Sequence, residues 1–173
     1  AAFYGIGAYS SAYVVVNLGW PWLAGVATAV VLTAVGGLLL ALPSLRLRGH
    51  YLAMATLGFG EIMRVFFVEA RSVTGGPDGL SGIPFPSVGG VALDTPGANY
   101  WLIWVTAMVV LLLAGNVVRS RPGRAMQALH GSESGALACG IDLVGLKVRV
   151  FVISAAVAGL AGALYAHVVG FIS

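Results

Sequence analysis

Two oppositely charged side chains stand inside an otherwise apolar stretch, and they are the residues of this chain best placed to do chemistry. Glu61 and Arg64 lie three positions apart in the stretch from Tyr51 to Val68. At this spacing the two side chains share one face of a helix and can form an ion pair. The pair could hold a zwitterionic ligand through its two charges, or it could lock the helix against its neighbours. The spacing leaves both roles open.

The position of this pair near the middle of its helix makes insertion of the helix into a membrane costly in free energy. Glu61 lies ten residues into the stretch, about 15 Å along a helix, which is near the middle of a membrane. The strongly apolar residues of the stretch contribute roughly −4 kcal/mol to insertion, whereas two central charges cost about 3 kcal/mol each. We therefore expect neighbouring helices to shelter this stretch, with Glu61 and Arg64 either paired or facing a hydrated cavity.

A second candidate is the polar stretch from Arg119 to Ile141, RSRPGRAMQALHGSESGALACGI, which lies between two long apolar runs. It carries three arginines and the helix breakers Pro122 and Gly123, followed by a segment of small residues. Ser132 suits the N-cap of a short helix, and Gly140 suits its end. We predict a helix of about two turns there, which is too short to be stable alone in water.

This short helix has a surface suited to a groove on another protein. Its acidic residue favours the positive end of the helix dipole, and small residues beside apolar ones would form an exposed knob. The candidate contact residues are Glu133, Gly135, Ala136, Leu137, Gly140 and Ile141. One interpretation is that a cytoplasmic partner holds this knob, and the other is an amphipathic helix resting on the membrane surface.

A third candidate is the glycine-rich segment from Thr74 to Pro84, TGGPDGLSGIP, inside the long connection from Glu69 to Asn99. Its density of turn-forming residues predicts an ordered loop. It could be an outer gate or a docking surface, or it could be a rigid glycine-proline corner. The candidate residues are Thr74, Gly75, Gly76, Pro77, Asp78 and Gly79.

Other reactive side chains indicate neither catalysis nor a metal site. His50, His130 and His167 stand at no metal-ligand spacing, so we expect them to be solvated or satisfied by hydrogen bonds. Cys139 is the single cysteine and has no CxxC or Cys/His partner. An intramembrane enzyme would need an activated nucleophile, and the sequence offers no such dyad.

The composition places these candidates in a membrane protein. Hydrophobic residues make up 59% of the 173 residues and charged residues 9%, against about 25% charged in soluble domains. The mean hydropathy is +0.96. The net charge of +3 does not indicate nucleic-acid binding, because the basic residues flank apolar segments.

The apolar runs predict an all-α, polytopic membrane helix bundle of about five spanning helices, with the short helix within residues 119–149 on the cytoplasmic side. The five predicted spans are Ala1 to Leu18, Trp22 to Leu42, Tyr51 to Val68, Tyr100 to Val118, and Val150 to Ile172. We expect residues 1–173 to form one transmembrane domain that belongs to a longer protein, with flanking spans missing at both ends.

The basic residues predict how these spans are oriented in the membrane, and the small residues predict which sides of them pack together. Seven of the nine Lys and Arg residues fall on one side, which places residues 119–149 inside the cell and the loop from Thr74 to Pro84 outside. Small residues flatten one side of the first span. In the last span Ser154, Ala158 and Gly162 stand four residues apart and predict a close-packing stripe.

Several motifs resemble those of one family in the same order. The internal segment resembles the coupling loop of ABC-importer permeases, which has a Glu, two small residues and a Gly. The segments AAFYGIGAY, LRLRGHYLAMATLGFGEIMR, TGGPDGLSGIP and GIDLVGLKVRVFVISAAVAGLAGALYA resemble the branched-chain amino-acid permease family. The chain departs from the pattern at Gly135, where an alanine is usual, and this could loosen the coupling helix.

The resemblance implies an ATP-driven importer of branched-chain or related amino acids in the cell (inner) membrane, working by alternating access. It implies cytoplasmic ATP-binding subunits that use ATP and Mg, a second permease subunit and an extracytoplasmic binding protein. The chain has no GxxxxGKS/T motif, so we expect it to bind no cofactor and to be no enzyme. A permease for urea or short amides is the nearest alternative, and a passive channel is the alternative from another class.

Overall fold

The structure is a computed structural model that describes residues 1–44, 50–88, 91–92, 95–131, 140 and 142–172. The helices are α1 (Ala2–Leu18), α2 (Trp22–Ser44), α3 (His50–Glu69), α4 (Arg71–Thr74), α5 (Pro96–Arg119), α6 (Arg121–Gly131) and α8 (Leu143–Val169), with the 3-10 turn η1 (Gly76–Asp78). The strands are β1 (Leu80–Ser81), β2 (Ser87–Val88), β3 (Val91–Ala92) and β4 (Phe171–Ile172). Long helices dominate, and this confirms the predicted all-α membrane bundle.

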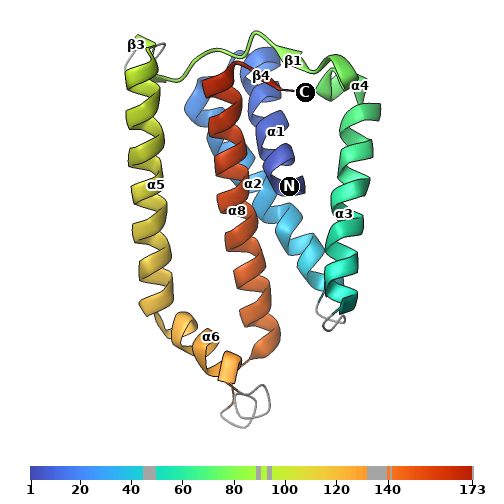
Figure 1. Ribbon diagram of the computed structural model, residues 1–173, viewed down its shortest axis with the longest axis vertical. Helices are drawn as coiled ribbons and strands as arrows, with labels where there is room; N and C mark the ends of the chain where they lie inside the picture. Colours follow the sequence, from blue (N-terminus) through green and yellow to red (C-terminus); the bar gives the residue numbers. More distant parts are fainter. Residues whose placement is uncertain (45–49, 89–90, 93–94, 132–139, 141, 173) are drawn as a thin grey trace.

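Three helices, α1, α2 and α8, form a close-packed core (Figure 1). Their contact faces consist largely of glycine and alanine, and Ala12 and Ala163 are completely buried. A Cβ added to Gly7 would clash with the backbone of Gly159, and one added to Gly159 would clash with Thr33. Glycine is required at these crossings because the helix backbones themselves touch.

The predicted small-residue side of α1 is confirmed, but the stripe predicted on α8 is displaced by one residue. Ser154 is exposed and Ala158 is only partly buried. Gly162 is buried as predicted, and the other buried residues in this half of α8 are Ala155, Gly159, Ala163, Ala166 and His167. The two stripes have the same four-residue spacing, and only contact with α1 and α2 distinguishes them.

The number of spans is smaller than predicted. Within the described residues, three helical segments are long and apolar enough to cross a membrane: Trp22–Ala41, Pro96–Arg119 and Leu143–Val169. Helix α1 has 17 residues, which is at the lower end of the range of about 17–25 for a spanning helix, and it is not among these three. Helix α3 has 20 residues and contains the charged pair.

Two helices start earlier than their apolar runs because polar residues cap them. Thr95 Oγ1 accepts a hydrogen bond from the backbone N–H of Ala98, so α5 begins at Pro96. Asp142 accepts one from the N–H of Gly145 at 3.1 Å, so α8 begins seven residues before the predicted span. Helix α8 then ends at Gly170, whose φ is +74°, and the next two residues form β4.

Helix α6 lies where the sequence predicted a break. Pro122 occupies the first turn of α6, where a missing N–H costs no hydrogen bond. The backbone oxygen of Ser120 accepts from Arg124 N at 3.1 Å, and its hydroxyl accepts from Gly123 N at 3.4 Å. Pro122 and Gly123 therefore lie in the first turn of α6, and the predicted break falls just before them, where α5 ends at Arg119 and the extended Ser120 separates the two helices.

The segment from Thr74 to Pro84, in the connection between α3 and α5, is ordered, as predicted, and it is fastened to the end of α8. Strand β1 pairs with β4 in an antiparallel register, with Leu80 opposite Ile172. The N–H of Ile83 donates to the carbonyl of Gly170 at 3.4 Å. Figure 1 shows this connection at one end of the bundle, with α6 and the start of α8 at the other. The two predicted loops therefore lie at opposite ends of the helices.

Candidate functional site

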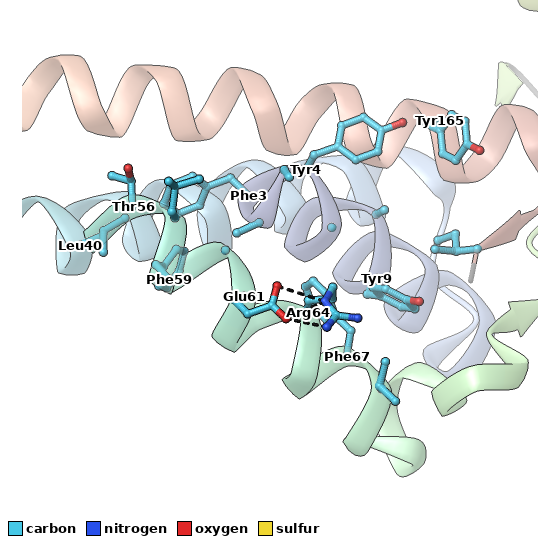
Figure 2. Close-up of a pocket in the computed structure, with 18 of the residues that line it drawn as sticks. Phe3, Tyr4, Tyr9, Leu40, Thr56, Phe59, Glu61, Arg64, Phe67 and Tyr165 are labelled. Carbon is cyan, nitrogen blue, oxygen red and sulfur yellow. Dashed lines mark hydrogen bonds and ion pairs between the residues drawn. The ribbon is translucent and has the colours of Figure 1, made fainter. Parts of the chain in front are cut away.

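A cleft of about 1180 Å³ lies between α1, α3 and α8 (Figure 2). One face of α3 forms a wall of this cleft, because its lining residues recur every three or four positions. They are Thr56, Leu57, Phe59, Gly60, Glu61, Arg64, Phe67 and Val68. The charged pair is therefore on the side of α3 that faces the cleft.

Glu61 and Arg64 form the ion pair that their spacing predicts. The Arg64 Nη2 atom lies 2.5 Å from Oε1 of Glu61, and Nε lies 3.0 and 3.1 Å from the two carboxylate oxygens. The two side chains are 69% and 62% exposed. We expected neighbouring helices to cover this ion pair. The described part of the chain does not cover it, because α3 contacts the core mainly on the side that faces α1.

Aromatic side chains make the contact between α3 and α1 on both sides of the pair. The rings of Phe3 and Phe59 lie 5.6 Å apart, and those of Tyr9 and Phe67 lie 4.9 Å apart. A Cβ at Gly5 would lie 2.6 Å from Cε2 of Phe67, so the glycine leaves room for this ring. No local pattern in the sequence reveals this seam, because each ring pair joins side chains of two separate helices.

A buried histidine, His167, links the core helices to the connection between α3 and α5. His167 Nε2 lies 2.9 Å from Ser11 Oγ, and Nδ1 lies 2.9 Å from the carbonyl oxygen of Pro84. A carbonyl only accepts, which places a proton on Nδ1, so in the neutral ring the Ser11 hydroxyl donates to Nε2. Trp22 packs edge-on against this imidazole and donates its indole N–H to the carbonyl of Ser87. His167 is thus a satisfied histidine, as predicted.

The third candidate, the segment from Thr74 to Pro84, forms a compact corner. The Thr74 hydroxyl is buried, lies 2.6 Å from the carbonyl oxygen of Phe67, and accepts from the N–H of Gly76 at 3.1 Å. Gly75, Gly76 and Gly79 have φ values of +76°, +63° and +70°, which favour glycine. Pro77 and Asp78 lie between them in η1. The role of this corner as a gate or a docking surface stays a prediction.

Of the short helix predicted between Ser132 and Gly140, the structure describes only Gly140. Glu133, Gly135, Ala136, Leu137 and Ile141 lie outside the described residues. Gly140 is exposed and has a φ of +73°, the left-handed conformation that is common directly after a helix. The helices on either side of this predicted helix in the sequence, α6 and the start of α8, lie at the end of the bundle opposite β1 and β4 (Figure 1).

The complete chain, residues 1–173, matches the family described as branched-chain amino acid transport system / permease component. The chain belongs to this family. It is 35% identical over 194 residues to the high-affinity branched-chain amino acid transport system permease proteins LivM of Escherichia coli K12 and Salmonella typhimurium LT2. A probable branched-chain amino acid transport permease protein, LivM of Methanocaldococcus jannaschii, is 27% identical over 138 residues.

The alignments cover 99% of this chain with the two bacterial permeases and 79% with the archaeal one, but only 46% and 39% of those proteins. The chain thus spans less than half the length of the curated relatives it matches. No solved structure gives a significant match. The family and the apolar helices make the chain part of a multi-pass permease of the inner membrane.

Proposed function

We propose that this chain is part of the membrane-spanning subunit of an ATP-driven importer, which moves branched-chain or related amino acids into the cytoplasm by alternating access. The observation that carries the proposal is the family match over all 173 residues. The cleft between α1, α3 and α8 supports it, because an ion pair inside an apolar cleft suits a solute that is both charged and apolar.

ATP acts on this chain through partners in the proposal. Two cytoplasmic ATP-binding subunits hydrolyse ATP with Mg, and one of them holds the coupling loop, residues 119–149, through Glu133 and its neighbours. A second permease subunit completes the pathway. An extracytoplasmic binding protein delivers the solute to the outer face, where the corner from Thr74 to Gly79 is the proposed docking surface or gate.

The contacts of the helices support a division into one rigid unit and one that can move. Helices α1, α2 and α8 meet through glycine backbones, and such packed interfaces resist deformation. Helix α3 meets this unit mainly through the ring pairs Phe3–Phe59 and Tyr9–Phe67. We infer that closure of the ATPase pair displaces the coupling loop, and that relative movement of α3 and the core opens the cleft to alternate sides.

The full-length permease, its second permease subunit, the ATPases and the binding protein should be reconstituted in proteoliposomes. Uptake of radiolabelled L-leucine is expected only with ATP and Mg, and it should stop when the ATPases are omitted. Uptake that persists without the ATPases would indicate a passive channel and contradict the proposal. ATP-dependent uptake of urea without uptake of leucine would identify the amide permease instead.

A further inference from the structure

The geometry points to an amino-acid binding site in the cleft itself, and we propose that the Glu61–Arg64 pair binds the zwitterionic head group while the aromatic seam binds the aliphatic side chain. The inference rests on the proposed function, which it deepens by naming how this chain recognises its solute. Figure 2 shows both charged side chains at the cleft between the two ring pairs.

Arg64 retains the hydrogen-bonding edge that a second carboxylate requires. A guanidinium has five N–H donors and can engage carboxylates along two edges. Its bonds to Glu61 use Nε and Nη2. Nη1 makes no hydrogen bond to any residue that the structure describes, so the edge formed by Nη1 and Nη2 can take the ligand carboxylate while the internal ion pair stays intact.

Glu61 can accept the ammonium group of the same ligand. An ionised carboxylate has about four lone-pair positions, and the bonds from Arg64 leave some of them unused. The ion pair has no net charge, and neither does a zwitterion, so the occupied site adds no charge at membrane depth. A ligand with only one of the two groups would leave a net charge in an apolar cleft, which is costly.

The rings beside the pair supply an apolar surface for a branched side chain. Phe3 and Phe59 lie on one side of the pair, and Tyr9 and Phe67 lie on the other (Figure 2). All four line the cleft. A branched aliphatic chain that leaves water for these rings is favoured in proportion to the apolar area that it buries. The site therefore selects amino acids that are apolar beyond the α-carbon.

Direct binding tests this inference apart from transport. The full-length transporter, assembled with its ATPases but without the binding protein, should be titrated with radiolabelled L-leucine. Two variants alter the head-group contacts: Arg64→Lys keeps the charge but loses the second edge, and Glu61→Gln removes the ammonium acceptor. Ile62→Ala is the matched control, because Ile62 is exposed on α3 but does not line the cleft.

We expect leucine binding to weaken about 10- to 100-fold in both head-group variants, the range for a lost hydrogen bond to a charged group. Ile62→Ala should bind normally, and the wild type should reject 4-methylpentanoate and 3-methylbutylamine, which each lack one charged group. Subunit assembly, followed by size-exclusion chromatography, should be unchanged in all variants.

Unchanged leucine binding in Arg64→Lys would overturn the inference, as would failure of a wild-type complex that transports leucine to bind it. A parallel loss of assembly and binding in Glu61→Gln would also overturn it, because it would show that the pair only locks α3 in place. In each of these cases ATP-driven uptake by the wild type would leave the proposed function standing. Absence of that uptake would contradict the proposed function itself.

Discussion

Ser11 Oγ lies 2.9 Å from Nε2 of His167, and this hydrogen bond joins α1 to the outer end of α8 in a place that solvent does not reach. The other ring nitrogen donates to the carbonyl of Pro84 in the outer connection. One imidazole therefore holds together two core helices and the loop that covers them. A buried ring with both nitrogens engaged stabilises only the arrangement that satisfies both.

Removal of either partner of this bond should destabilise the protein. Ser11→Ala leaves Nε2 without its partner, and an unsatisfied buried group costs about 1–3 kcal/mol. His167→Phe should cost at least as much, because the Ser11 hydroxyl and the Pro84 carbonyl both lose a partner. The melting temperature of the purified full-length permease in detergent measures the effect.

The matched control for Ser11 is one residue away. The Ser10 hydroxyl donates to the carbonyl of Gly7 within the same helix, so Ser10→Ala should change the melting temperature little. The double variant Ser11→Ala/His167→Phe should lose less stability than the sum of the two single variants. Equal losses in Ser10→Ala and Ser11→Ala would show that the bond to His167 has no special importance.

Substitution of Gly7 by alanine should separate the core helices. The added Cβ would clash with the backbone of Gly159, and overpacking of this kind costs about 1–3 kcal/mol. Gly115→Ala on α5 is the control, because no described atom lies within 4 Å of a Cβ built there. Thermal unfolding in detergent should show a lower midpoint for Gly7→Ala alone, and similar midpoints for both variants would contradict this packing.

The outer corner should depend on the hydroxyl of Thr74. In Thr74→Val the bonds to the Phe67 carbonyl and the Gly76 N–H are lost, and the corner should open to protease. Thr74→Ser keeps the hydroxyl and should behave as the wild type. We expect faster proteolysis from the outer face and weaker binding-protein docking in Thr74→Val only. Equal damage by serine and valine would contradict this prediction, because it would show that the methyl group stabilises the corner as much as the hydroxyl does.

Changes in the inner segment should uncouple ATP hydrolysis from uptake. Glu133→Lys reverses the charge of the predicted coupling helix, and Gly140→Trp places a large side chain where φ is +73°. We expect membrane insertion to persist and ATP-driven leucine uptake to be lost. Gly140→Asn is the control, because asparagine tolerates this conformation. Normal uptake in both Glu133→Lys and Gly140→Trp would remove the coupling role from this segment.

Much of the fold could be predicted because apolar runs report directly on helices that lie in a membrane. The same runs could not locate the helix ends, since Thr95 and Asp142 extend α5 and α8 into polar sequence by capping them. Small-residue spacing revealed that α8 packs closely but not which side does so. Ser154 and Ala155 begin equivalent four-residue series, and the contacts with α1 and α2 bury the second.

The candidate site was predictable in one part and hidden in another. Glu61 and Arg64 are close in sequence, so helical spacing alone predicts their contact. The bond between Ser11 and His167 spans 156 positions, and the ring pair Tyr9–Phe67 joins separate helices. Such contacts depend on how helices are placed next to each other, and no local pattern in one sequence records that placement.

Helix α8 begins at Leu143, directly after its N-cap Asp142, and is 27 residues long, and the strand that follows it, β4, pairs with β1 in the connection between α3 and α5. At 1.5 Å per residue α8 is a rod of about 40 Å. Glycines pack α8 closely against α1 and α2 along the half of the helix that is nearest β4. We therefore expect this half not to bend when the other end of α8 is displaced. If the ATPases displace the segment before Asp142 as proposed, we expect the displacement to appear at the paired strands β1 and β4 as a tilt of the complete helix.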